Sequence, residues 1–206
     1  APVCKRSLCL REPLCADAVL AEVAESWSGR PGPVFLELPL DVQAVQVPEA
    51  WGETENLAPP NPQGSNFAPE PQQVAEVAAK FRAAERPLLL LGGGLSHRQA
   101  RALEAKLAAL DLPIMTTWNG ADRYPPDYPN YAGRPNTWGQ RSSNIILQQA
   151  DLVVAVGSRL GLQQTGFNWQ QFVPLGEVIQ IDIDPAELAK PNPRLAAGIQ
   201  ADADQF

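Results

Sequence analysis

The sequence predicts an α/β protein whose main part, residues 71–206, is a Rossmann-like, doubly wound parallel sheet. A helix–strand remnant precedes it. After residue 71, short apolar runs alternate with helical periodicities, which is typical of a parallel sheet covered on both faces. Right-handed crossovers between these strands give the doubly wound topology. Glycines or polar residues follow the apolar runs, where open parallel sheets bind their ligands.

The N-terminal part supplies one helix and one strand. Ala16, Leu20 and Val23 recur at helical spacing, so we expect a helix over residues 14–28, stopped by the glycines and prolines of residues 29–33. Residues 34–38 (Val-Phe-Leu-Glu-Leu) form a short strand-like run. One helix cannot cover both faces of a strand, so this pair needs a sheet that the chain is not expected to contain.

A proline-dense stretch follows. From Leu40 to Pro71 prolines are frequent and apolar periodicity vanishes, so we expect no regular elements there. The expected organisation is a remnant over residues 1–45, a linker over 46–70 and a domain over 71–206.

The main domain alternates regular elements. Helices are expected around residues 74–81, 100–110 and 139–149, and strands at 87–91, 113–117, 151–157 and 177–184, with a long loop reaching about Trp138.

Composition excludes several classes of partner. The chain has 206 residues and a formal charge of −7 without a long basic cluster, so neither nucleic acid nor an anionic membrane is an expected partner. No run approaches the roughly 20 apolar residues of a membrane span. Cys4, Cys9 and Cys15 lack metal-site spacing, and His97 is the only histidine. We therefore expect no zinc site, reduced thiols, a cytoplasmic location and a solvated His97 that opens a helix.

Two strand ends carry glycines or hydroxyls. Gly92, Gly93 and Gly94 follow the first strand of the domain and either let a phosphate approach the backbone or simply form a tight turn. Thr116 and Thr117 end the next strand, where their hydroxyls either bind a nucleotide or cap the following segment.

Two further strand ends carry charges. Gly157 allows close approach, and Arg159 either forks onto a phosphate or lies on the surface as an ordinary arginine. Asp182 is placed to accept from ribose hydroxyls, whereas Asp184 before Pro185 suits a helix N-cap, with Glu187 in the first turn.

The sequence lacks the common motifs of enzymes that catalyse reactions with their own side chains. The sequence has no Gly-x-Ser-x-Gly elbow and no Walker loop, and no carboxylate pair stands out as a general acid and base. The chain is therefore not expected to do covalent chemistry unaided.

Several motifs together resemble one known family. Residues 29–34, running into 38–43 (Leu-Pro-Leu-Asp-Val-Gln), resemble the end of the pyrimidine-binding domain of thiamine-diphosphate enzymes. Residues 87–94, 157–159 and 181–188 resemble that family's central domain. Asn119 and residues 131–135, 157–160 and 168–169 are most similar to acetolactate-synthase-like members, and a subgroup associated with surface polysaccharides has similar turns.

The resemblance implies a cofactor site. In acetolactate synthases the central domain carries FAD in a structural role. The positions that match it here are Gly92, Gly93, Gly94, Thr116, Thr117, Gly133, Gly157, Arg159, Asp182, Ile183, Asp184 and Asp202. Two family segments differ: residues 133–136 read Gly-Arg-Pro-Asn instead of Gly-Met-His-Gly, and 159–163 read Arg-Leu-Gly-Leu-Gln instead of Arg-Phe-Asp-Asp-Arg. The occupant therefore stays open between FAD, ADP, another nucleotide and none.

The resemblance also implies a larger parent enzyme. That parent would use thiamine diphosphate and Mg²⁺ to decarboxylate a 2-oxo acid and join the product to an acceptor, as a transferase or carboligase that forms a homo-oligomer. The activating glutamate and the Gly-Asp-Gly…Asn magnesium motif belong to the pyrimidine and diphosphate domains, so the chain alone is expected to be inactive. The alternatives are an NAD-linked oxidoreductase domain, a sirtuin-like deacylase and a purely structural spacer.

Overall fold

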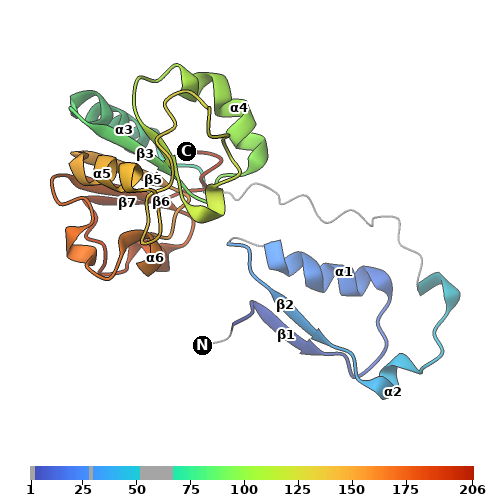
Figure 1. The fold of residues 1–206 in the computed structure, drawn as a ribbon. Coiled ribbons are helices and arrows are strands. Elements are labelled where there is room, and N and C mark those ends of the chain that lie inside the picture. Colours follow the sequence, from blue (N-terminus) through green and yellow to red (C-terminus); the bar gives the residue numbers. More distant parts are fainter. Residues whose placement is uncertain (1–2, 28–29, 52–66) are drawn as a thin grey trace. The chain divides into compact units, whose positions relative to one another are not determined.

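A computed structural model of the chain describes residues 3–27, 30–51 and 67–206 (Figure 1). The chain divides into two compact units, Ala1–Ser65 and Asn66–Phe206, which are described separately.

The first unit contains a two-stranded parallel sheet. Strand β1 (Arg6–Cys9) pairs in register with β2 (Val34–Glu37), so that Arg6 lies opposite Val34 and Cys9 opposite Glu37. The expectation that the strand at 34–38 has no sheet partner in this chain is therefore wrong. Strand β1 escaped sequence analysis because its four residues include only one large apolar side chain, Leu8.

This unit buries little apolar surface. Helix α1 (Ala16–Ala24) and the 3-10 turn η1 (Glu25–Trp27) occupy the predicted helix, whose last predicted residue, Ser28, lies outside the described residues. An ion pair between Arg6 and Glu22, at 3.0 Å, joins β1 to α1. Leu10 is the one buried hydrophobic residue in the described part of this unit, and Phe35 of β2 is 56% exposed.

The proline-dense stretch is partly regular. A short helix, α2 (Leu40–Gln43), and a 3-10 turn, η2 (Glu49–Trp51), lie in it, so the expectation of no regular elements is wrong for residues 40–51. Residues 52–66, most of the expected linker, lie outside the described residues.

The second unit is built on a five-stranded, all-parallel sheet in the order β4-β3-β5-β6-β7 (Figure 1). The four predicted strands are present. The strand bounds are β3 Pro87–Leu91, β4 Ile114–Thr116, β5 Leu152–Val156, β6 Glu177–Asp182 and β7 Ala197–Gln200, of which β7 was not predicted.

Helices cover both faces of this sheet. Leu89, Val154 and Ile179 point into one core with Val77 of α3 and Leu107 of α4. The alternate strand residues, such as Leu88 and Val153, point into a second core with Leu147 of α5. The helix bounds are α3 Pro71–Ala83, α4 His97–Ala108, α5 Arg141–Gln149, α6 Leu162–Thr165 and α7 Pro185–Leu188, with 3-10 turns η3 Trp118–Gly120 and η4 Trp169–Gln171. The doubly wound fold predicted from the sequence is confirmed.

Local sequence signals start the helices at their observed positions. Glu70 and Gln73 form a capping box around the first turn of α3, and Pro71 occupies its first position. The Ser96 hydroxyl caps α4 by accepting from the Gln99 amide at 3.1 Å, so His97 opens this helix as predicted.

The strand order defines where a ligand is expected. Counted from β3, the order is 2-1-3-4-5, so the chain reverses direction across the sheet between β3 and β5. Open α/β sheets bind ligands beyond the carboxyl ends of the strands at such a switch point. Leu91 pairs with Val156, so the residues that follow them, Gly92 and Gly157, lie side by side at this position.

Candidate nucleotide site at the sheet switch point

The two turns at the switch point are in direct backbone contact. The Gly92 amide donates to the Val156 carbonyl at 2.8 Å, and the Gly94 amide donates to the Gly157 carbonyl at 2.9 Å. A Cβ atom on Gly92 would lie 2.1 Å from the Gly157 oxygen, and one on Gly94 would lie 2.8 Å from the Gly157 Cα. Gly157 itself has a φ of +62°. The structure therefore gives these three glycines a packing role in holding the two turns together.

Arg123 braces the glycine turn from the long loop after β4. Its side chain is 8% exposed, its Nε donates to the Leu95 carbonyl at 2.6 Å, and its Nη2 donates to the Gly93 carbonyl at 3.3 Å. A Cβ atom on Gly93 would lie 2.9 Å from the Asn119 Cβ. Sequence analysis missed Arg123 because nothing in a loop sequence marks an arginine that bonds distant carbonyls.

Thr116 and Gly133 form an internal pair. The Thr116 side chain is fully buried, its Oγ1 lies 2.8 Å from the Tyr131 hydroxyl, and its amide donates to the Gly133 carbonyl at 3.2 Å. Gly133 has a φ of +86°, and a Cβ there would lie 2.0 Å from the Gln140 Oε1. Thr117 is also buried, and its amide donates to the Leu91 carbonyl at 2.9 Å.

Arg159, just after β5, reaches α7, the short helix that follows β6. Its Nε donates to Oε1 of Glu187 at 2.7 Å. The Arg159 side chain is 66% exposed, whereas that of Glu187 is 8% exposed. Of the predicted site residues described in this unit, Arg159 presents the exposed positive charge.

The Asp182-Ile183-Asp184 segment forms two successive capping turns. Oδ1 of Asp182, which is buried, accepts from the Asp184 amide at 3.0 Å. Oδ1 of Asp184 accepts from the Ala186 amide at 2.9 Å and caps α7, as predicted. The Ile183 carbonyl accepts from Gln200 of β7 at 3.3 Å.

Asp202 lies in a turn that returns the chain to the switch point. Its Oδ1 accepts from the Asp204 amide at 2.9 Å, and Oδ1 of Asp204 accepts from the Ser96 amide at 2.7 Å. A Cβ on Gly157 would meet Ala203 Cβ at 3.0 Å. This turn therefore lies beside both the start of α4 and the turn after β5.

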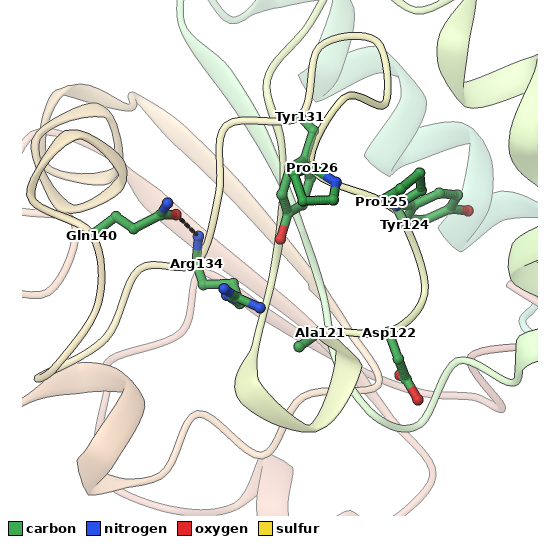
Figure 2. Close-up of a pocket in the computed structure, with 8 residues that line it drawn as sticks. All are labelled: Ala121, Asp122, Tyr124, Pro125, Pro126, Tyr131, Arg134 and Gln140. Carbon is green, nitrogen blue, oxygen red and sulfur yellow. Dashed lines mark hydrogen bonds between the residues drawn. The ribbon is translucent and has the colours of Figure 1, made fainter.

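A pocket of about 380 Å³ lies in the long loop between β4 and α5, next to the Thr116–Gly133 pair (Figure 2). Figure 2 shows the Arg134 amide bonded to Gln140 Oε1, at 3.1 Å. None of the twelve predicted site residues lines this pocket. Its lining residues are Ala121, Asp122, Tyr124, Pro125, Pro126, Tyr131, Arg134 and Gln140.

Asp122, which lines this pocket, contacts the single histidine of the chain. His97 Nε2 lies 2.8 Å from Asp122 Oδ2, and both side chains are more than half exposed. The hydrogen bond from His97 lowers the pKa of Asp122, and the nearby Arg123 charge adds to the effect. Burial raises the pKa of Tyr124, another lining residue, to about 12, and its hydroxyl donates to the Ala100 carbonyl.

Within residues 3–27, 30–51 and 67–206, no group of three or more His, Cys, Asp or Glu side chains is arranged to hold a metal ion. No helix among these residues has both the length and the apolar character needed to span a bilayer. Cys4, Cys9 and Cys15 are free thiols.

Comparison with known proteins gives one consistent result. Residues 74–206 match the family model described as the thiamine pyrophosphate enzyme, central domain. The chain is 37% identical to the acetolactate synthase isozyme 1 large subunit of Escherichia coli K12 over 180 residues, 86% of this chain and 30% of that protein. It is 34% identical to an acetolactate synthase of Mycobacterium bovis over 191 residues, 92% of this chain and 30% of that protein.

The chain thus spans about 30% of the length of the curated relatives it matches. The family match covers the five-stranded sheet, its helices from residue 74 onward and every predicted strand-end residue of the second unit. The chain belongs to the thiamine pyrophosphate enzyme family, and residues 74–206 are a central domain of that family.

Proposed function

We propose that this chain is the central-domain part of an acetolactate-synthase-like carboligase, a cytoplasmic homo-oligomer acting on a 2-oxo acid. The similarity to acetolactate synthases over most of the chain supports this reading. Thiamine diphosphate (thiamine pyrophosphate) and Mg²⁺ would be held by other domains of the parent. The proposed role of this chain is nucleotide binding or structural support, since the cofactor of the parent supplies the carbanion chemistry.

Within this chain we propose an adenine-nucleotide site at the switch point, with ADP or FAD as the ligand. The observation that carries it is the exposed guanidinium of Arg159, which stands at the carboxyl end of β5 beside the glycine turns and the Asp182 turn. Arginine stays protonated and binds phosphate oxygens through a planar fork. The carboxylate of Asp182 would accept from ribose hydroxyls, as acids do at strand ends of nucleotide-binding folds.

The first test of this site is calorimetric titration of ADP and FAD into wild type and Arg159→Ala. A charge-assisted hydrogen bond to phosphate is worth roughly 1.5–3 kcal/mol, so the substitution should weaken binding about ten- to a hundredfold. The fold should stay intact because the Arg159 side chain is exposed. Unchanged binding in Arg159→Ala would move the site elsewhere.

A second variant separates ribose from phosphate recognition. Asp182→Asn keeps an acceptor for the Asp184 amide but removes the charge. It should weaken ADP and FAD while leaving inorganic phosphate little affected. Mass spectrometry of small molecules released from the denatured protein identifies the natural occupant.

A structural spacer is the second candidate. It is favoured by the contacts of Gly92, Gly94 and Gly157, whose lack of side chains is already required by backbone packing. Absence of ADP and FAD binding to wild type at millimolar concentration would decide for the spacer.

The isolated chain should have no carboligase activity. The expected result is no acetolactate from pyruvate with this chain, thiamine diphosphate and Mg²⁺, because the resemblance implies that the activating glutamate and the magnesium motif belong to other domains of the parent. The full-length E. coli isozyme 1 large subunit is the positive control, and measurable product from the 206-residue chain would refute the assignment.

A further inference from the structure

A buried carboxylate lies between two cations at the edge of the switch-point site. Glu187 is 8% exposed, and its Oε1 accepts from Arg159 Nε at 2.7 Å. Its Oε2 lies 2.6 Å from Lys190 Nζ, and Lys190 also donates to the Arg159 carbonyl at 2.5 Å. Lys190 therefore contacts both partners of the Arg159–Glu187 pair.

The chain positions Glu187 through successive turns. Asp182 at the end of β6 bonds the Asp184 amide, Asp184 caps α7, and Glu187 is the third residue of that helix. These short links leave Glu187 little freedom. They hold its carboxylate beside the turn after β5, where Arg159 originates.

The bond to Nε has a geometric consequence for Arg159. Guanidinium donors lie in one plane, so fixing Nε fixes the direction of the two terminal nitrogens. These nitrogens belong to a side chain that is 66% exposed. Two cations face one carboxylate, so the cluster keeps a net charge of +1 toward an anion.

We propose that Glu187 is a positioning residue, which orients Arg159 so that its terminal nitrogens bind the diphosphate of the nucleotide. This role rests on the nucleotide site proposed above. Sequence reasoning treated Glu187 only as an acid in the first turn of a helix. The contact with Arg159 joins residues 28 positions apart in the chain.

The test uses the fact that loss of orientation and loss of negative charge at Glu187 should change ADP affinity in opposite directions. Removing the Glu187 carboxylate makes the cluster more positive, so simple attraction would tighten ADP binding. Loss of orientation should instead weaken it between about two- and tenfold, the cost of immobilising one rotamer-rich side chain. Glu187→Met, which has no strong acceptor, should show the full loss. Glu187→Gln retains an acceptor for Nε and should lie between Met and wild type.

The control removes the same charge elsewhere. Glu177 pairs with Lys80 at the opposite, amino end of β6, so Glu177→Gln should leave ADP affinity unchanged. Thermal unfolding of each variant verifies folding. If Glu187→Met does not fold, Glu187→Gln carries the test because its side chain has nearly the same shape.

NMR of the Arg159 Nε–H reports the positioning without ligand. Hydrogen exchange at Nε should be slowed in wild type and fast in Glu187→Met, with Arg159→Lys assigning the signal.

Fast exchange in wild type, or tighter ADP binding in Glu187→Met, overturns the positioning role. If Arg159→Ala weakens ADP but both Glu187 variants bind as wild type, only this role fails. If wild type binds no ADP, the nucleotide site itself fails as well.

Discussion

At the scale of single residues, the glycines of the switch point are required because neighbouring backbone atoms leave no room for a side chain. Gly157 adopts a left-handed φ of +62°, and its Cβ position lies 2.8 Å from the Gly94 Cα. Backbone atoms cannot move aside as the end of a flexible side chain can. A glycine here is required whether or not a nucleotide binds.

This requirement predicts a large effect of Gly157→Ala. The left-handed conformation costs a non-glycine residue about 1–2 kcal/mol, and crowding in a packed site adds about 1–3 kcal/mol. We expect a loss of unfolding free energy of at least about 2 kcal/mol in urea titrations. Gly161→Ala is the matched control, because no atom lies within 4 Å of its Cβ position, and it should change stability by less than about 0.5 kcal/mol. Equal effects of the two substitutions would contradict this account.

Local signals at this scale were readable from the sequence, and non-local ones were not. The N-cap role of Asp184 and the opening of a helix at His97 follow from neighbouring residues, and both predictions are confirmed. The bond from Arg123 to the Gly93 carbonyl spans 30 positions. The ligand roles assigned to the twelve site residues remain predictions.

At the scale of elements, Asp151 joins the starts of two neighbouring strands. Its carboxylate accepts from the Glu85 amide at 2.8 Å and the Arg86 amide at 2.9 Å, just before β3, while Asp151 itself precedes β5. Burial raises the pKa of Asp151, but these two backbone hydrogen bonds together with the Arg86 charge and the Asp151 amide outweigh it, so the pKa is lowered overall.

The lowered pKa gives Asp151→Asn a defined pH signature. Asparagine keeps one acceptor oxygen and loses the other, so stability at pH 7 should fall by about 1 kcal/mol. A carboxylate with a lowered folded pKa contributes its stability above the unfolded value of about 4 and loses it as pH falls through the folded value. The difference between wild type and variant should therefore shrink below pH 4. Urea unfolding at several pH values measures it, with exposed Asp127→Asn as control; a difference independent of pH would refute the charge argument.

Strand β7 is the strand of the main sheet that the sequence did not predict. Predicted strands β3 and β5 are continuous apolar runs, because each is covered on both faces. Strand β7 (Ala-Gly-Ile-Gln) lies at the edge of the sheet and contains one large apolar side chain, Ile199. Pairing with β6, rather than an intrinsic preference, makes this segment a strand.

At the scale of the whole molecule, the two units differ in the number of buried hydrophobic residues that each contains. The second unit has a hydrophobic cluster on each face of its sheet. In the described part of the first unit, Leu10 alone is a buried hydrophobic residue. The proline-dense sequence led us to expect a division of this kind, and the boundaries at 45 and 70 remain a prediction.

The imbalance predicts separate opening of the two units, which hydrogen exchange of the full chain can measure. Segments with few buried contacts open first, so amides of β2 (Val34–Glu37) should exchange at least about a hundredfold faster than those of β5 (Leu152–Val156). Gly157→Ala provides the internal control. Because the atoms nearest the Gly157 Cβ position all belong to the second unit, the variant should accelerate exchange in β5 and leave β2 unchanged. Equal protection of β2 and β5 in wild type, or a parallel loss in both strands of the variant, would mean that the chain opens as one cooperative body.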